Sequence, residues 1–278
     1  MLDSQDSNPH FAEISYGGNA LLIEHAWIEP LNRGPLIIFL HEGLGSLKMW
    51  RTFPQVLCKL TGYRGLVYSR CGYGASSPLW PDKNWPVDFM HVEAREILPR
   101  LLTSLGVGPS KQPPILFGHS DGASIALIYA STYPPRVSAV IALAPHLFVE
   151  SITVSSIERT SAAFIDSDLA TKLGKYHAEV QRVFWGWVSV WLNQKFRNWD
   201  IRSLCNSLAC PTLAVQGLED QYGTMKQIED LQRAARQVRL LALKDCGHSP
   251  HIDKPEAVIA AVIDLLKCTN MALPPNEV

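Results

Sequence analysis

Short apolar runs recur along the chain and alternate with longer segments of helical period. Most of these runs are rich in β-branched residues and are bounded by Gly or Pro, which is typical of buried strands. Such an alternation predicts an α/β fold, in which helices cover both faces of a mostly parallel sheet. We expect eight strands, in the stretches FAEISY, ALLIEHAWI, PLIIFLHEG, GLVYSRCG, PILFGHS, SAVIALAP, PTLAVQG and VRLLALKDCG.

The first two runs are joined by the stretch Gly17-Gly18-Asn19, which is a signal for a tight hairpin. We therefore expect the sheet to begin with an antiparallel ribbon. The segments of helical period predict helices over 87–106, 122–133, 224–236 and 255–268. Pro99 lies inside the first of these segments and predicts a kink there, because a proline lacks the backbone N–H that a helix interior requires.

Between Pro145 and Pro211 the alternation stops, and helical patterning continues without a convincing strand. This segment is dense in aromatic residues, and we interpret it as a helical cap inserted over the sheet. A chain of 278 residues with 47% hydrophobic and 18% charged residues can form one large core with such an insertion. We therefore expect core residues 1–146, a cap over 147–208 and core residues 209–278.

The charges of the chain are balanced, with 25 Lys and Arg against 26 Asp and Glu and a formal net charge of -1. No long-range field would recruit nucleic acid or an anionic membrane, so we expect neither as a partner. The first ten residues lack the basic start and apolar run of a signal peptide, which predicts a cytoplasmic protein. We expect a small-molecule substrate as the partner, and a homodimer stays open.

The cysteines are scattered in or beside apolar segments, without the close pairing of a zinc site or a disulfide scaffold. We expect buried free thiols and neither a metal nor any other cofactor. The residues concerned are Cys58, Cys71, Cys205, Cys210, Cys246 and Cys268.

A sharp turn is predicted where the run PILFGHS meets an Ala-rich helical segment. Gly118 and Gly122 bracket Ser120 in the pattern Gly-x-Ser-x-Gly, and residues without a Cβ let strand and helix approach closely. The Ser120 hydroxyl then stands at the carboxyl edge of the sheet, where a helix start offers free amides to an oxyanion. Consecutive side chains on a tight turn diverge, so His119 and Asp121 are expected to point away from that hydroxyl.

The base and the acid must come from other loops beyond the carboxyl ends of the strands. His248 directly follows Gly247 at the end of the last strand and is the expected base, with His251 as the alternative. Asp220 follows the preceding strand and can orient an imidazole from the side opposite the serine, with Glu219 as its competitor.

A second donor for an oxyanion is expected in the loop after PLIIF, where glycines let the backbone turn its amides toward the nucleophile. Gly43 is the expected donor and Leu44 the alternate. His41 is expected to hold this loop through a hydrogen bond.

Five motifs in this order resemble the α/β-hydrolase superfamily, in the branch with a helical cap, over nearly the whole chain. They are LHEGLGSLKMW, YSRCGYGASS, GHSDG, QGLEDQYGT and CGHSPH. The resemblance implies Ser120 as nucleophile, His248 as base and Asp220 as acid. It also implies an oxyanion hole formed by the amides of Asp121 and Gly43.

Two positions depart from the family pattern. Many relatives have glycine where this chain has Glu42, whose carboxylate could anchor the loop, lie near the oxyanion hole or bind Arg70. Relatives often carry Met, Gln or Leu at the position of Asp121. The dehalogenases and epoxide hydrolases of the superfamily use aspartate at the turn, so Ser120 argues against both activities.

A serine nucleophile favours acyl transfer to water, as in a carboxylesterase-like serine hydrolase (EC 3.1.1) acting on a small or medium, largely apolar ester. Phe184, Trp187 and Trp191 follow helical spacings and are expected, with Leu44, to contact the substrate. The same stripe could instead pack the cap onto the sheet. Three alternatives stay open: a C–C bond hydrolase of ring-cleavage products, cofactor-free perhydrolysis or lyase chemistry, and a ligand-binding receptor with a slow triad.

Overall fold

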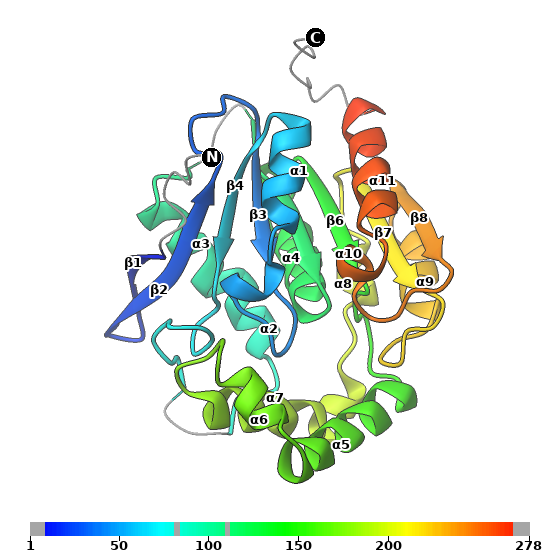
Figure 1. Ribbon diagram of the computed structural model, residues 1–278. Coiled ribbons are helices and arrows are strands. Elements are labelled where there is room, and N and C mark those ends of the chain that lie inside the picture. Colours follow the sequence, from blue (N-terminus) through cyan, green and yellow to red (C-terminus); the bar gives the residue numbers. More distant parts are fainter. Residues whose placement is uncertain (1–8, 81–83, 109–111, 269–278) are drawn as a thin grey trace.

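The computed structural model describes residues 9–80, 84–108 and 112–268. Strands form one eight-stranded sheet in the order β1-β2-β4-β3-β5-β6-β7-β8 (Figure 1). The pairs β1–β2 and β2–β4 are antiparallel and the other neighbouring pairs are parallel, which confirms the predicted sheet. The strands are β1 (His10–Tyr16), β2 (Asn19–Ile28), β3 (Leu36–Leu40), β4 (Arg64–Tyr68), β5 (Ile115–His119), β6 (Ala139–Leu143), β7 (Thr212–Gly217) and β8 (Val238–Leu243).

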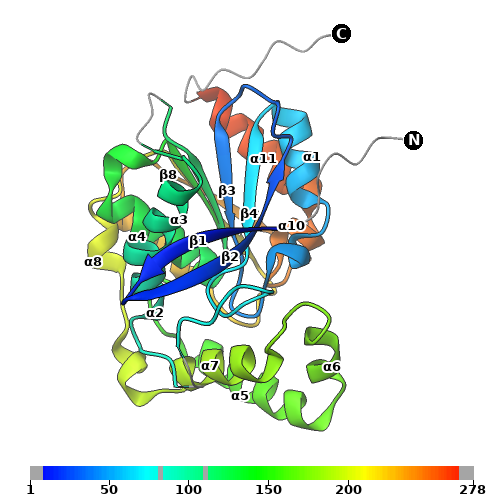
Figure 2. The same ribbon diagram turned by 90° about the vertical axis from the view of Figure 1, so that its left-hand side faces the viewer.

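The central strands β3, β5 and β6 are buried at every residue, because helices cover both faces of the sheet. On one face lie α1 (Phe53–Thr61) and α11 (Pro255–Cys268), over one hydrophobic cluster. The other face is covered by α4 (Asp121–Thr132) and α9 (Lys226–Ala234), with a second cluster beneath them. Figure 2 shows the two helical layers on either side of the strands.

The helix predicted around Pro99 is built from three consecutive pieces. These are α2 (Phe89–Val92), a π-helical segment (Glu93–Ile97) and α3 (Leu98–Ser104). Pro99 cannot donate to the carbonyl of Arg95, and the Tyr133 hydroxyl donates to that carbonyl instead, at 3.1 Å. The irregularity thus lies in the turn before the proline.

The remaining predicted helices are found as α4, α9 and α11, whereas α1 was not predicted. A 3₁₀ turn (Leu47–Trp50) precedes α1, and Pro54 sits in its first turn, where a missing N–H is tolerated. The short helix α10 (Pro250–Asp253) leads into α11.

The helices between β6 and β7 lie mainly beyond the carboxyl ends of the strands, at the lower side of the molecule in Figure 1. They are α5 (Ser151–Asp166), α6 (Leu169–Leu173), α7 (Val180–Trp191), a 3₁₀ turn (Gln194–Asn198) and α8 (Arg202–Cys205). Within this segment α8 packs against α4 and α9, so it belongs to the helical layer of the sheet. The helices that face the strand ends are therefore α5 to α7, which we call the cap helices.

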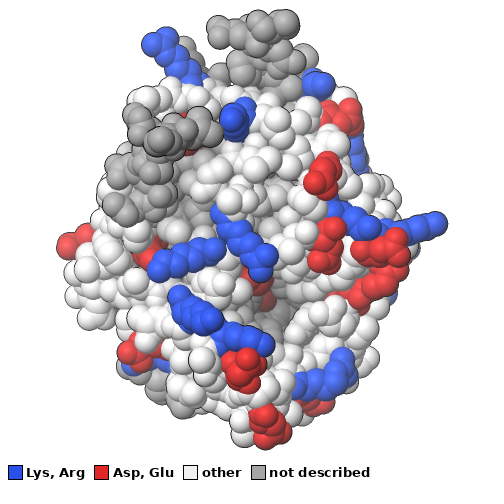
Figure 3. Space-filling model, in the orientation of Figure 1, with Lys and Arg blue, Asp and Glu red and all other residues white. Residues whose placement is uncertain are grey.

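Charged side chains of both signs are interspersed over the face shown in Figure 3.

Five of the cysteines are buried, whereas Cys268, at the end of α11, is exposed, contrary to the expectation of burial. Among the described residues no helix has the length and apolar character needed to cross a membrane.

Candidate active site

Ser120 occupies a strained turn between β5 and α4. Its φ of 52° lies in the left-handed region, which a residue with a side chain rarely adopts. A Cβ on Gly122 would lie 2.0 Å from the Leu40 carbonyl oxygen, and one on Gly118 would lie 2.4 Å from the Gly122 carbonyl oxygen. Both glycines are therefore required by the close approach of α4 to β3 and β5.

The structure brings Ser120, His248 and Asp220 into one hydrogen-bonded chain. His248 Nε2 lies 2.8 Å from Ser120 Oγ, and His248 Nδ1 lies 2.8 Å from Asp220 Oδ2. An ionised carboxylate can only accept, so the Nδ1–H of His248 donates to Asp220 and Nε2 is free to accept the Ser120 proton. This is the geometry of a nucleophile beside a general base.

Several donors hold the Asp220 carboxylate in place. The amide of Tyr222 donates to Oδ1 at 2.7 Å, and the side-chain amide of Gln216 donates to Oδ2 at 2.6 Å. Burial by itself would raise the pKa of Asp220, but the adjacent His248 and the hydrogen bond from the Tyr222 amide outweigh it and lower the pKa. Asp220 is thus ionised and able to orient His248.

The two competing residues lie elsewhere. Glu219 accepts a hydrogen bond from the Cys246 amide and so anchors the loop after β8. His251 is buried against the rings of Trp50 and Phe53, and burial lowers its pKa to about 3. Neither residue contacts Ser120 in the described structure.

His119 turns away from Ser120 and bonds the backbone of His248. Its Nε2 lies 2.6 Å from the His248 carbonyl oxygen, so Nε2 carries the proton and donates. Its Nδ1 lies 3.5 Å from Glu42 Oε2. Burial would raise the pKa of Glu42, but the interactions with His119 lower it well below its usual range. Glu42 thus supports the residue that holds His248.

The loop after β3 lies against the same site. His41 Nε2 accepts the Arg70 amide at 3.0 Å, while Nδ1 lies 2.8 Å from the Glu42 carbonyl oxygen, so His41 anchors the loop. The buried Arg70 guanidinium donates to that carbonyl oxygen at 2.8 Å and lies 3.9 Å from Asp121 Oδ2. Arg70 therefore bonds the Glu42 backbone, whereas the Glu42 side chain faces His119.

Gly43 and Asp121 both border the cavity beside Ser120. Asp121 is the first residue of α4, so its amide is one of those that a helix leaves without an internal partner. The structure thus brings both predicted oxyanion-hole residues to the cavity that contains Ser120.

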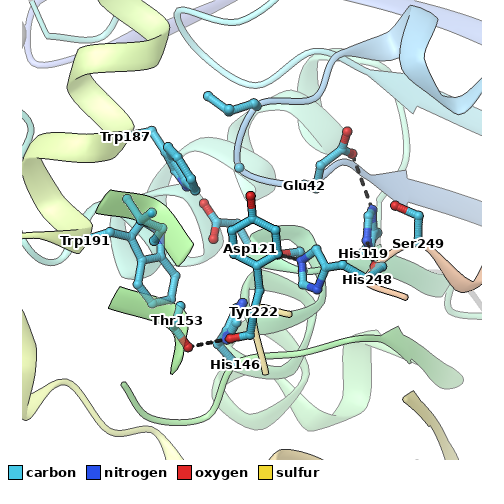
Figure 4. A pocket seen from close by; sticks show the side chains of 14 residues that line it. Glu42, His119, Asp121, His146, Thr153, Trp187, Trp191, Tyr222, His248 and Ser249 are labelled. Atoms are coloured by element: carbon cyan, nitrogen blue, oxygen red, sulfur yellow. Dashed lines mark hydrogen bonds and ion pairs between the residues drawn. The ribbon is translucent and has the colours of Figure 1, made fainter. Parts of the chain in front are cut away.

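A cavity of about 160 Å³ opens at Ser120 beneath the cap helices (Figure 4). Leu44, Trp187 and Trp191 line it, as the sequence predicted. The Trp187 indole packs on Gly43, where a Cβ would lie 2.2 Å from Nε1. Phe184 does not line the cavity, contrary to the prediction, because its ring stacks on Phe164 of α5 at 3.7 Å within the cap.

Sequence reasoning missed other residues that line the cavity, among them His146, Thr153 and Tyr222. His146 follows β6, and its ring lies 5.8 Å from that of His248. Burial lowers the pKa of His146 to about 3, so its ring is neutral. Tyr222 packs its ring 4.8 Å from that of His248. Both follow the carboxyl ends of strands, and that position was the signal that could have identified them.

Solved structures similar to this chain share its fold. An esterase from Thermogutta terrifontis is 20% identical, with a TM-score of 0.69 over 95% of this chain and 99% of the other. An enol-lactonase from Burkholderia xenovorans is 17% identical, with a TM-score of 0.71 over 93% and 100%. A carboxylesterase structure from Nitrososphaera gargenis is 18% identical, with a TM-score of 0.72 over 92% and 98%.

These structural similarities have low sequence identity, whereas a family profile assigns the chain to a family. The profile described as the alpha/beta hydrolase fold matches residues 35–183, which is more than half of the chain. The chain belongs to the α/β-hydrolase fold family.

Proposed function

We propose that this protein is a serine hydrolase that cleaves a small, largely apolar carboxylic ester through an acyl-enzyme. The observation that carries this proposal is the chain of two 2.8 Å contacts from Ser120 through His248 to Asp220. This geometry supports the proposal, because acyl transfer requires a hydroxyl nucleophile, an imidazole that accepts its proton and a carboxylate that orients the imidazole.

The reaction begins when Ser120 Oγ attacks the ester carbonyl carbon and its proton passes to His248 Nε2. The carbonyl oxygen becomes an oxyanion, which the amides of Asp121 and Gly43 stabilise. The C–O bond to the alcohol then breaks, and His248 returns the proton to the departing alkoxide oxygen. The acyl group remains on Ser120 as an ester.

Water completes the cycle. It attacks the acyl carbon while His248 takes one of its protons, and collapse of the second tetrahedral intermediate releases the carboxylic acid. His248 gives the proton back to Ser120 Oγ. The similarity in fold to esterases and an enol-lactonase supports an ester bond as the target, since those proteins cleave the same kind of bond.

Hydrolysis of 4-nitrophenyl butyrate by Ser120→Ala tests the proposal. We expect the variant to lose at least about 10³-fold in kcat/KM, because the covalent step has no substitute nucleophile. Ser249→Ala is the matched control, since Ser249 lines the same cavity. Folding is checked by circular dichroism. Retention of activity by Ser120→Ala would refute the proposed nucleophile.

A further inference from the structure

One wall of the cavity carries polar groups that the proposed mechanism does not use. Asp121 contributes its side chain there, beside the indole rings of Trp187 and Trp191 from α7 (Figure 4). Asp121 is 1% exposed, yet its Oδ2 has no hydrogen-bond partner among the described residues. The indole Nε1 of Trp187 also lacks one, whereas the Trp191 side chain interacts with the Asp121 carboxylate and lowers its pKa. Buried polar atoms without partners are rare and call for a ligand or water.

The neighbouring Arg70 guanidinium does not form a hydrogen bond with the Asp121 carboxylate. Arg70 lies 3.9 Å from Asp121 Oδ2, too far for a hydrogen bond, and it donates to the Glu42 carbonyl oxygen instead. Glu42 adds a second carboxylate to the cavity lining. No Lys or Arg among the described residues lines the cavity, so a carboxylate on the substrate would face like charges and find no counter-ion.

Asp121 Oδ2 and the Trp187 indole N–H match the hydrogen-bonding capacity of a hydroxyl. A hydroxyl has one proton to donate, which the Asp121 carboxylate can accept, and lone pairs that can accept from an indole N–H. A methyl group in the same place would leave Asp121 Oδ2 and the Trp187 indole N–H buried without partners. The cavity volume of about 160 Å³ is close to that of an apolar cavity that admits benzene, which favours a short group at this wall.

The direction of the reaction assigns this wall to the acyl half of the substrate. His248 protonates the departing alcohol, so the alcohol leaves on the His248 side of Ser120. In Figure 4 the indoles of Trp187 and Trp191 lie on the opposite side of the cavity from His248. The acyl chain is therefore directed toward Asp121 and the two indoles.

We propose that the substrate is an ester of a short, uncharged acyl group that carries a hydroxyl, and that Asp121, held by Trp191, and Trp187 bind this hydroxyl. This rests on the proposed esterase function. It also distinguishes that function from the C–C bond hydrolase alternative, because the vinylogous diketo acids cleaved by such enzymes carry a carboxylate that this wall would repel.

Three methyl esters of matched shape test the proposal: methyl 3-hydroxybutanoate, methyl 3-methylbutanoate and monomethyl malonate. They place a hydroxyl, a methyl or a carboxylate oxygen at the same distance from the ester. Hydrolysis is followed in a pH-stat at pH 8, above the pKa of about 6 to which burial raises Asp121 against the influence of Arg70. For the wild type we expect kcat/KM to favour the hydroxy ester by about tenfold over the methyl ester and by more over the malonate ester.

Asp121→Asn keeps the side-chain shape and removes the charge. It should reduce the discrimination against monomethyl malonate by about tenfold or more. Glu42→Gln is the comparison variant, because it neutralises the other lining carboxylate. It should preserve the ratio of kcat/KM for the hydroxy ester to kcat/KM for the methyl ester, whatever its effect on the absolute rates. Equal or better use of the methyl ester by the wild type would overturn the proposal. So would Asp121→Asn if both ratios stayed unchanged.

Binding separates this inference from the proposed function. Ser120→Ala should bind the three esters in the same order without cleaving them, measured through the fluorescence of the lining tryptophans. If Ser120→Ala binds the esters selectively but the wild type hydrolyses none of them, the proposed hydroxyl-binding site is supported and the esterase function is refuted. If all three esters are bound equally and hydrolysed at equal rates, the esterase function is supported and the proposed hydroxyl-binding site is refuted.

Discussion

At the scale of single residues, His248 and His251 lie three positions apart in surroundings that give them different chemistry. His248 is linked to both Ser120 and Asp220, whereas His251 packs among aromatic rings. Burial lowers the pKa of His251 to about 3, so the ring stays neutral at ordinary pH. Of these two histidines, His248 is the one within hydrogen-bond distance of Ser120.

His248→Ala should therefore lower kcat/KM for 4-nitrophenyl butyrate by about 10³-fold or more, because no other base among the described residues hydrogen-bonds to Ser120. His251→Phe is the matched variant, since a phenyl ring preserves the packing on Trp50 and Phe53. It should stay within about tenfold of the wild type. Steady-state kinetics measures kcat/KM for both variants. A larger loss in His251→Phe than in His248→Ala would identify His251 as the base instead of His248.

The sequence predicted the partners of Ser120 that follow strand ends, because a parallel sheet brings those ends to one edge. The sequence alone could not predict that the His119 side chain donates to the His248 carbonyl oxygen, or that the Glu42 side chain faces His119. Those contacts depend on side-chain orientation, and neighbouring positions in a turn do not specify it. His119 thus shares a turn with Ser120 while its ring supports the base.

At the scale of elements, strand prediction succeeded because buried parallel strands form uninterrupted apolar runs. Helical spacing showed that Phe184, Trp187 and Trp191 share a face of α7. It could not show how that face divides between the cavity and α5, where Phe184 stacks on Phe164. The helix α1 was missed, although its buried positions Phe53, Leu57 and Thr61 follow helical spacing.

The packing of α4 on β3 gives a prediction about Gly122. Gly122→Ala would place a Cβ 2.0 Å from the backbone oxygen of Leu40, which cannot rotate away. We expect a loss of about 3 kcal/mol or more in the free energy of unfolding, together with loss of activity as the Ser120 turn shifts. Urea denaturation measures the first effect.

Gly108→Ala serves as the control for this substitution, because a Cβ there meets no atom within 4 Å. It should leave the urea midpoint nearly unchanged. A stable, active Gly122→Ala would mean that α4 does not lie as close to β3 as described.

At the scale of the whole molecule, buried carboxyl groups couple the stability of the protein to pH, although the net charge of the chain is close to zero. Burial raises the pKa of Glu93 to about 7, against an ordinary value of 4.5 and against the attraction of Arg70. The Tyr68 hydroxyl donates to Glu93 at 3.0 Å. The folded state therefore binds a proton at Glu93 more tightly than the unfolded chain does.

The sign of the effect follows from this linkage. The stability that the protonated Glu93 contributes is fully present below pH 4.5 and is lost as the pH rises through about 7. Between pH 5 and pH 8 the wild type should lose about 2 kcal/mol of unfolding free energy from this group. The buried Asp121 acts in the same direction, since its pKa is also raised.

Glu93→Gln should remove most of the Glu93 part of this pH dependence, because glutamine stays neutral and can still accept from Tyr68. Glu96→Gln is the control, since Glu96 is only half-buried in the same helical segment and pairs with Arg100 at 2.7 Å. Urea denaturation at pH 5 and pH 8 compares the three proteins. An unchanged pH dependence in Glu93→Gln would contradict the assignment.

The central claim is that Ser120, activated by His248, forms a covalent acyl-enzyme. The most direct test treats the folded protein with a fluorophosphonate, which phosphonylates activated serines, and locates the label by peptide mass spectrometry. We predict one phosphonyl group, on the peptide that contains Ser120, in the wild type, and labelling slower by at least about 10²-fold in His248→Ala. A label on another residue, or an equal rate without His248, would contradict the account.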